Sequence, residues 1–214
     1  LAMEDKVVAV LGDHCSSCCM AIAPLLDDFK IAGLTIECAA DAVTQPGHEF
    51  YFRMRPSMGL MAPLGIPRIV EIFKPKTAGF ININDDYGHS FRDSFKAELA
   101  KHGVETTVEE DFERGTTDFT VYLTKIKRVK PEVAFYVGAI SEGALIVKQA
   151  RELGVTDKTA LFGAEEMAEM ELLSLAGADA IEGTYALALW GSVDPAFAKQ
   201  VQDRFNAPMH YGII

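Results

Sequence analysis

The sequence has no long apolar run and comparatively little positive charge. No segment approaches the roughly 18 consecutive apolar residues of a membrane-spanning helix, and the start, LAMEDKVV, lacks the basic and apolar regions of a secretion signal. Lys and Arg number 20 against 31 Asp and Glu, which leaves a net charge of −11, and the basic residues form no cluster. This balance excludes nucleic acid and anionic membranes as the main partner and favours a small molecule.

Cysteine is also scarce. The four cysteines, at positions 15, 18, 19 and 38, are too few and too clustered for a disulfide-stapled scaffold, and they do not define the redox compartment. By contrast, 49% hydrophobic residues in a chain of 214 are ample for one large domain or two small ones. Because the chain starts at Leu1 and ends after Ile214 without a stop signal, we expect it to be an interior fragment of a longer protein.

Several sequence motifs of enzymes and cofactor sites are missing. The chain contains no Walker loop, G-x-G-x-x-G, G-x-S-x-G or H-E-x-x-H, and its five histidines are scattered without i,i+4 pairing. The sequence therefore predicts no catalytic residues, no cofactor and no metal, and we expect a protein that is not an enzyme.

Apolar runs of strand length alternate with segments of helical periodicity along the chain. The expected strands are residues 7–11, 34–38, 51–54, 77–83, 104–108, 133–137, 161–163 and 183–189. The expected helices are residues 17–30, 58–73, 90–102, 118–130, 142–153, 167–175 and 195–205, with Pro63 and Pro67 predicting a kink or a late start in the second. Continuous apolar strands joined through helices predict an α/β fold with parallel sheets that are covered by helices on both faces.

The pattern changes near residues 73–77. Before this point the strand-helix units are irregular and rich in Pro and Met, and after it they repeat regularly, so we expect a lobe boundary there. The first part has about three expected strands, fewer than the four to six of a typical stable sheet, which indicates that it lacks partner strands. Ligands of such sheets bind at the carboxyl ends of strands, which directs attention to the loops that follow the strands.

The loop GDHCSSCCM follows the first expected strand and opens a helix, and it has four interpretations. Cys15 and Cys18 are spaced as in a thiol oxidoreductase, but the chain does not have the length or the mixed sheet of a thioredoxin-type domain. A zinc site would combine these two cysteines with His14 and Cys19, which are crowded together without a second cluster of ligands.

Two further interpretations concern the serines of the same loop. Ser16 and Ser17, together with free N–H groups at the start of a helix, can receive a carboxylate, because the helix dipole attracts an anion there and hydroxyls add donors. Alternatively, one serine only caps the helix and the cysteines are small core residues.

Acidic residues follow two later strands. In the turn NINDDYG, we expect an Asp to cap the next helix and Tyr87 to reach into a cleft, although a solvated turn with a packing tyrosine is the alternative. Glu165 and Glu166 follow the strand LFG, where a carboxylate can pair with a ligand's ammonium group or stabilise the first turn of a helix.

These segments occur in the order of a known family. From VVAVLGDHCSS through FYFRMRPS, FININDDYGHSF, DFTVYLTKIKRVKPEVAFYVGAISEGALIVKQARELGV and LFGAEE to GADAIEGTY, the chain resembles type I periplasmic solute-binding proteins of the leucine/isoleucine/valine-binding kind, the receptors of branched-chain amino-acid ABC transporters. The resemblance implies two α/β lobes that close on a ligand. It assigns residues 1–75 to a partial lobe 1, 76–206 to lobe 2 and 207–214 to the return to lobe 1, with further segments missing at both ends.

The resemblance also assigns the site residues. In lobe 1 it gives the ligand carboxylate to Ser16, Ser17 and a loop at Ala39 and Ala40, although the threonine of that loop is absent. Cys15 matches a family cysteine that can pair with one further upstream, outside this chain.

In lobe 2, Tyr87 matches the family's cleft tyrosine and Glu165 the acid that pairs with the α-ammonium group. Ala139 stands where many amino-acid binders have an aromatic residue, which widens the pocket and makes an aromatic ligand an additional expectation.

The implied function is the capture of an amino acid or related small carboxylate for a membrane ABC permease, without catalysis. The implied location is periplasmic or extracytoplasmic, with a signal peptide in the full precursor and a membrane anchor if the protein is a lipoprotein. A sensory or regulatory domain of the same fold is the alternative function, and thiol-disulfide exchange at Cys15 and Cys18 is a second one.

Overall fold

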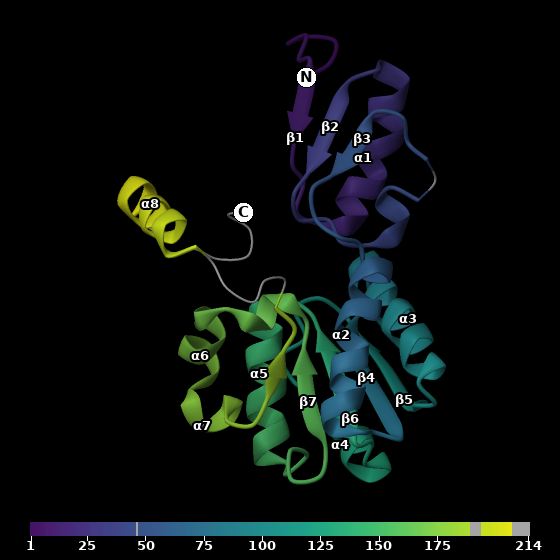
Figure 1. The fold of residues 1–214 in the computed structure, drawn as a ribbon, viewed down its shortest axis with the longest axis vertical. Coiled ribbons are helices and arrows are strands. Elements are labelled where there is room, and N and C mark those ends of the chain that lie inside the picture. Colours follow the sequence, from purple (N-terminus) through teal and green to yellow (C-terminus); the bar gives the residue numbers. More distant parts are fainter. Residues whose placement is uncertain (46, 189–193, 207–214) are drawn as a thin grey trace. The chain divides into compact units, whose positions relative to one another are not determined.

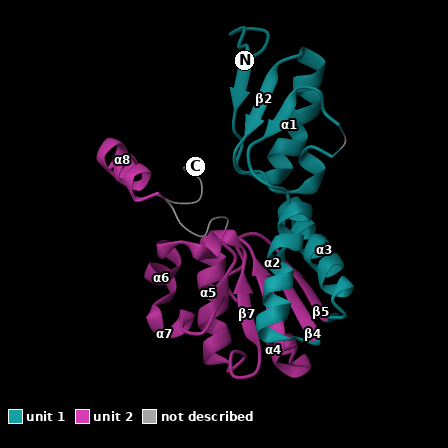
Figure 2. Cartoon of the chain, viewed as in Figure 1, with its two compact units in different colours: residues 1–76, 82–106 teal, residues 77–81, 107–214 magenta. Residues whose placement is uncertain are grey.

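The computed structural model describes residues 1–45, 47–188 and 194–206 and shows an α/β protein (Figure 1). The chain divides into two compact units, unit 1 with residues 1–76 and 82–106 and unit 2 with residues 77–81 and 107–214 (Figure 2). The expected return segment at 207–214 and the end of the expected strand at 183–189 lie outside the described residues. This division groups residues 82–106 with the first part of the chain, whereas the resemblance assigned them to lobe 2. The lobe boundaries themselves stay a prediction.

Unit 1 contains a three-stranded parallel sheet in the order β1-β2-β3. Its elements are β1 (Ala9–Leu11), α1 (Ser16–Phe29), β2 (Ala32–Thr35), η1 (Asp41–Val43), β3 (Tyr51–Arg53), α2 (Met58–Phe73) and α3 (Asp86–Lys101). The three strands are the number expected from the sequence. Helix α2 begins at Met58 as predicted and continues through both prolines.

Unit 2 is built on a sheet in the order β5-β4-β6-β7-β8, in which β6, β7 and β8 run parallel. The strands of this sheet are β4 (Thr77–Ile83), whose last two residues fall in unit 1, β5 (Glu105–Phe112), β6 (Val133–Val137), β7 (Ala160–Gly163) and β8 (Tyr185–Ala186). The helices are α4 (Thr120–Val129), α5 (Ile140–Glu152), η2 (Glu165–Ala168), α6 (Met170–Ala176), α7 (Ala178–Ile181) and α8 (Pro195–Phe205). From β4 the chain goes first to the edge strand β5 and then crosses back to β6, β7 and β8 on the other side of β4. This is the doubly wound arrangement expected.

An aromatic row crosses four neighbouring strands of the second sheet. The ring centroids of Phe80 and Phe135 lie 5.3 Å apart, those of Phe135 and Phe162 lie 5.6 Å apart, and those of Phe162 and Tyr185 lie 5.0 Å apart. Contacts of this kind contribute about 0.5–1.5 kcal/mol per pair beyond the burial of apolar area. The row therefore adds side-chain contacts across four strands that backbone pairing places side by side.

The core of unit 1 contains a disulfide that the cysteine count did not predict. Cys19, in the second turn of α1, is bonded to Cys38, which follows β2, and both residues are fully buried. Cys15 and Cys18 are free thiols. The pairing therefore joins the first helix to the loop after the second strand.

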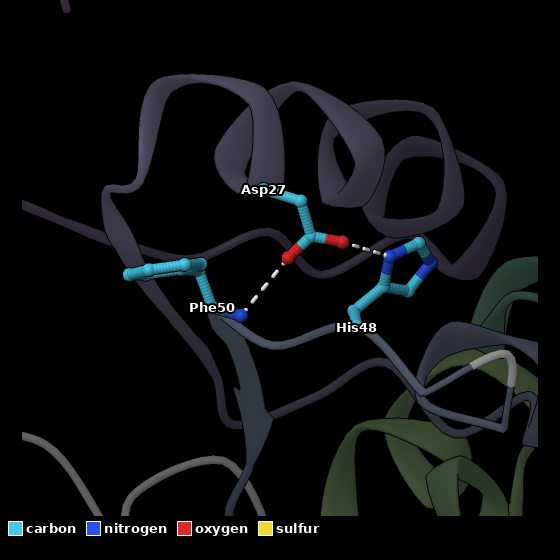
Figure 3. A network of polar contacts seen from close by, with 3 residues as sticks. All are labelled: Asp27, His48 and Phe50. Atoms are coloured by element: carbon cyan, nitrogen blue, oxygen red, sulfur yellow. Dashed lines mark hydrogen bonds and ion pairs between the residues drawn. The ribbon is translucent and has the colours of Figure 1, made fainter.

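The last turn of α1 is tied to the segment that enters β3. The carboxylate of Asp27 accepts a hydrogen bond from the His48 ring at 2.6 Å and another from the Phe50 amide at 2.9 Å (Figure 3). The hydrogen bond from His48 holds the pKa of Asp27 below its usual range. An acidic residue is otherwise unfavourable at the negative end of a helix, so these contacts offset its position.

None of the helices in the described ranges is long and apolar enough to cross a membrane.

We predict that Asp27→Asn lowers the melting temperature at about pH 5, and that the difference from wild type shrinks in acid. Because the pKa of Asp27 is lowered in the folded state, its contribution is present above the unfolded pKa of about 3.9 and is lost as pH falls through the folded pKa. Thermal unfolding over a pH series measures this. Asp28→Asn, at the exposed next position, is the control, and equal effects of the two variants would contradict the prediction.

We also predict that reduction of the Cys19–Cys38 disulfide lowers stability by about 3 kcal/mol, because it releases a closed loop whose ends are 19 residues apart. Peptide mapping without reductant should recover the linked pair, and unfolding with and without reductant measures the loss. In a Cys15→Ser, Cys18→Ser variant the effect of reductant should persist. A map without a Cys19–Cys38 peptide would refute the assignment.

Candidate functional site

In unit 1 the loops after β1 and β2 are held together by a buried threonine. Because β1 and β2 are parallel neighbours, their carboxyl ends lie at the same edge of the sheet. The Thr35 hydroxyl donates to the Asp13 carbonyl at 2.8 Å and accepts from the Cys38 amide at 3.1 Å. Thr35 is fully buried, so water does not compete for these hydrogen bonds.

Ser16 connects the same two loops more directly. It is the first residue of α1, its exposed fraction is 3%, and its hydroxyl accepts a hydrogen bond from the Ala40 amide at 3.2 Å. Ala39 and Ala40 are buried as well. The structure thus brings together three residues that the resemblance assigned to one carboxylate-binding role, and Ser16 keeps its hydroxyl proton to donate.

The start of α1 is suited to an anion. This helix has 14 residues, no acidic residue in its first turn and no side-chain hydrogen bond from its N-cap, Cys15. No carboxylate belongs to this turn itself, so none opposes the helix dipole from within it. Two lie just outside: Asp13 accepts a hydrogen bond from the Cys15 amide at 3.4 Å, and Asp86 accepts one from the Ser17 hydroxyl.

Ser17 is engaged differently from Ser16. Its hydroxyl donates to the carboxylate of Asp86, the first residue of α3, at 2.5 Å. Both residues belong to unit 1, as does the next residue, Tyr87, which is partly buried. The Ser17 hydroxyl thus binds a carboxylate of the chain itself.

The turn before α3 shows how its two adjacent aspartates differ. Asp85 is the N-cap and accepts a hydrogen bond from the Gly88 amide at 3.0 Å, which confirms the expected cap. Gly88 is required by space, because a Cβ there would overlap the Ile83 carbonyl oxygen. With Asp85 capping and Asp86 held by Ser17, the two carboxylates have separate partners.

Asp41 stands beside the Ala39 and Ala40 loop and was not recognised from the sequence. Its carboxylate accepts hydrogen bonds from the Gly59 amide at 3.0 and 3.1 Å and from the Ser94 hydroxyl at 3.0 Å, and its amide donates to the Ser90 hydroxyl at 3.0 Å. It thereby supplies an acceptor for the first turn of α2, where Ser57 makes no side-chain cap.

Arg53, in β3, holds the other side of this loop. Its guanidinium donates to the Ala40 carbonyl at 2.7 Å and to the Thr44 hydroxyl at 2.6 Å. Burial lowers the pKa of Arg53 below its usual value. A charged residue within the apolar strand FYFRM is the signal in the sequence that could have identified it.

The free thiol of Cys18 does not have the acidity of a reactive cysteine. A hydrogen bond with the Cys15 thiol is the main cause that raises the pKa of Cys18 to about 11. A reactive thiol requires the opposite shift, because the thiolate is the nucleophile. In the described part of the chain, no group of three or more His, Cys, Asp or Glu side chains is placed to hold a metal ion.

In unit 2, Ala139 and Glu165 follow the neighbouring parallel strands β6 and β7. Ala139 is the N-cap of α5, and its amide donates to the Glu142 carboxylate at 2.9 Å. The other oxygen of Glu142 accepts from the Gly115 amide at 2.7 Å. Glu142 has an exposed fraction of 5%, and it joins the loop after β5 to the start of α5.

Glu165 begins the short helix η2 directly after β7, and its exposed fraction is only 1%. The preceding amide, of Ala164, donates to the Tyr136 carbonyl at 3.1 Å, which fixes the exit of the chain from the sheet. The sequence left open whether Glu165 stabilises the first turn of a helix or receives a ligand. The structure places it at the start of η2 and buried, and its role with a ligand stays a prediction.

The sequence of this chain matches a family of known proteins over nearly its whole length. The family model described as "Periplasmic binding protein" matches residues 1–210. A Pseudomonas aeruginosa protein named "Amino acid binding protein" is 32% identical over 156 residues, which are 73% of this chain and 42% of that protein. The chain thus spans less than half the length of this curated relative.

Solved structures share the fold over nearly all of the chain. A leucine binding protein from Thermotoga maritima has a TM-score of 0.88 at 22% identity, covering 98% of this chain and 61% of that one. A solute binding protein from R. palustris, in complex with benzoate, has a TM-score of 0.87 at 16% identity, covering 99% and 59%. By the match of its sequence and the agreement of its fold, this chain belongs to the periplasmic binding protein family and has the type I fold.

Proposed function

We propose that the full protein is the solute-binding receptor of an ABC transporter and captures an amino acid or a related small carboxylate by closure of two lobes. The observation that carries this proposal is the Ser16–Ala40 hydrogen bond at the start of α1, which gathers a hydroxyl and backbone amides at the positive end of a helix. Family membership supports it independently.

The ligand carboxylate is assigned to the first turn of α1. Ser16 donates its hydroxyl proton, and the N–H groups of the first turn add further donors beside the Asp86 carboxylate that Ser17 holds. Thr35 and Arg53 keep the two loops in place, so that little ordering is left to be done when a ligand binds.

The ammonium group of the ligand is assigned to Glu165. A buried carboxylate loses hydration, and a cation restores the lost interaction, so a ligand with an amine is favoured over a neutral one. A micromolar ligand requires about 8 kcal/mol of binding free energy. A few charge-assisted hydrogen bonds supply an amount of this order.

We assign the selection of the ligand's side group by size to the position of Ala139. A methyl group at the N-cap of α5 leaves room that a larger side chain would fill. The relatives in the comparisons include a leucine binding protein and one in complex with benzoate, which supports testing both aliphatic and aromatic ligands.

The proposal includes a partner and a location. A membrane ABC permease reads the closed form, and the receptor works in the periplasm or another extracytoplasmic space. No bond is made or broken, because selection rests on the differential affinity of the ligand for the closed state.

We predict that Glu165→Gln weakens the binding of α-amino acids at least about tenfold, equivalent to about 1.4 kcal/mol, and leaves their des-amino analogues unaffected or bound more tightly. The substitution removes the charged acceptor of the ligand's ammonium group. It also removes the cost of burying a carboxylate against a ligand that has no ammonium group. Calorimetry with L-leucine against 4-methylpentanoate, and L-phenylalanine against 3-phenylpropanoate, measures this. Glu166→Gln is the matched control. Amino-acid binding unaffected by Glu165→Gln would contradict the ammonium assignment.

We predict that Ser16→Ala weakens amino acids and des-amino acids alike, by about 1–2 kcal/mol, because both carry the carboxylate. The Ala40 amide also loses its acceptor in this variant. Thermal shift with each ligand measures the change. Ser174→Ala, an exposed serine that bonds only to the backbone of its own helix, is the control. A loss confined to ligands with an amine would refute the assignment.

A further inference from the structure

Met167 is held in a socket formed by two glycines. It lies in η2, two residues after Glu165, and its exposed fraction is 3%. A Cβ added to Gly143, in α5, would overlap the sulfur and the methyl group of Met167, and one added to Gly163, at the end of β7, would overlap Met167 Cβ. Neither glycine has the left-handed backbone that favours glycine. Glycine therefore suits both positions because the Met167 side chain occupies the space beside them.

Tyr136 forms a further wall of this socket. It comes from β6, and its exposed fraction is 1%. Its ring Cε2 atom lies 3.5 Å from the position of a Cβ on Gly143, and its hydroxyl oxygen lies 2.8 Å from the position of one on Gly163. The methionine socket, defined as Tyr136, Gly143, Gly163 and Met167, thus joins β6, β7, α5 and η2.

The segment that carries Glu165 has little support of its own. Helix η2 has four residues, and a helix of one turn is not stabilised by its own hydrogen bonds. Its anchors include the Ala164 amide, which donates to the Tyr136 carbonyl at 3.1 Å, the Met167 amide, which donates to the Ala164 carbonyl at 2.9 Å, and the Met167 side chain in the socket. The Met167 side chain is thus an anchor that opposes displacement of η2, and of Glu165 with it, towards solvent.

We propose that Met167 is a positioning residue that holds Glu165 where a ligand's ammonium group is received, and so determines the preference for ligands with an amine. This inference rests on the proposed function. It assigns selectivity to a methionine that has no charge and no hydrogen-bonding role of its own. Methionine suits the position because its unbranched side chain fits the narrow space left by two glycines.

Two substitutions test the socket from opposite sides in the full chain. Met167→Ala removes the side chain, and Gly143→Ala fills the space that the side chain occupies. Met167→Ala leaves a cavity, whereas Gly143→Ala adds volume, so a cavity alone does not explain an effect that the two variants share. Met167→Leu restores most of the volume, and Met170→Ala removes a methionine that is 73% exposed in the neighbouring helix.

The readout is the ratio of affinities for L-leucine over 4-methylpentanoate and for L-phenylalanine over 3-phenylpropanoate, measured by calorimetry. We expect Met167→Ala and Gly143→Ala to lower this ratio about tenfold, Met167→Leu to recover most of it, and Met170→Ala to match wild type. A merely structural residue would weaken both members of a pair equally. A wild-type ratio in Met167→Ala would overturn the inference while leaving the proposed function intact.

Hydrogen exchange distinguishes a failure of the inference about Met167 from a failure of the proposed function. Without ligand, we expect the Met167 amide to lose protection in Met167→Ala and in Gly143→Ala, but not in Met170→Ala. If the wild-type protein shows no preference for amines, the ammonium assignment of the proposed function fails and the selectivity role of Met167 fails with it. Unchanged exchange at residues 165–168 in Met167→Ala would refute the socket as the anchor of Glu165 whatever the ligand.

Discussion

The hydrogen bond from the Ala40 amide to the Ser16 hydroxyl is the contact on which the arrangement of the loops after β1 and β2 depends. It joins two loops that follow different strands, and it does so at the start of a helix whose dipole favours an anion. Thr35, Arg53 and the Cys19–Cys38 disulfide act on the same two loops from other directions. The loops are therefore arranged before any ligand arrives, and binding has less conformational entropy to overcome.

The segments that follow β6 and β7 in unit 2 are held by different means. In unit 2 the polar contacts of Glu142 arrange the start of α5, whereas the segment with Glu165 depends on apolar packing of Met167. Packing of this kind sets a position by excluded volume, because protein interiors have few voids into which a side chain can relax. On the proposed function, polar contacts hold the loops that receive a ligand's carboxylate, and apolar packing holds the segment that receives its ammonium group.

Most elements were predictable from the sequence, and the errors have local causes. The second strand was expected at residues 34–38, but β2 ends at Thr35 because the hydroxyl of that residue bonds back to the loop before α1 and Cys38 is drawn to Cys19. The third helix was expected to begin at residue 90 and begins at Asp86, since its polar first turn is held by the Asp85 cap rather than by an apolar stripe. The short helix α7 was missed because four residues carry no readable period.

The sequence by itself determined the alternation of strands and helices, the parallel fold and an aspartate cap before α3, because these follow from periodicity and from contacts within a few residues. The family was indicated by the resemblance of its segments, taken in order. Only the tertiary structure decided which cysteines pair and which side chains join the loops. The partners in question are 19 residues apart for Cys19 and Cys38, 24 for Ser16 and Ala40, and 53 for Asp41 and Ser94. Contacts over such separations depend on how the chain returns to the same sheet edge, which no local pattern specifies.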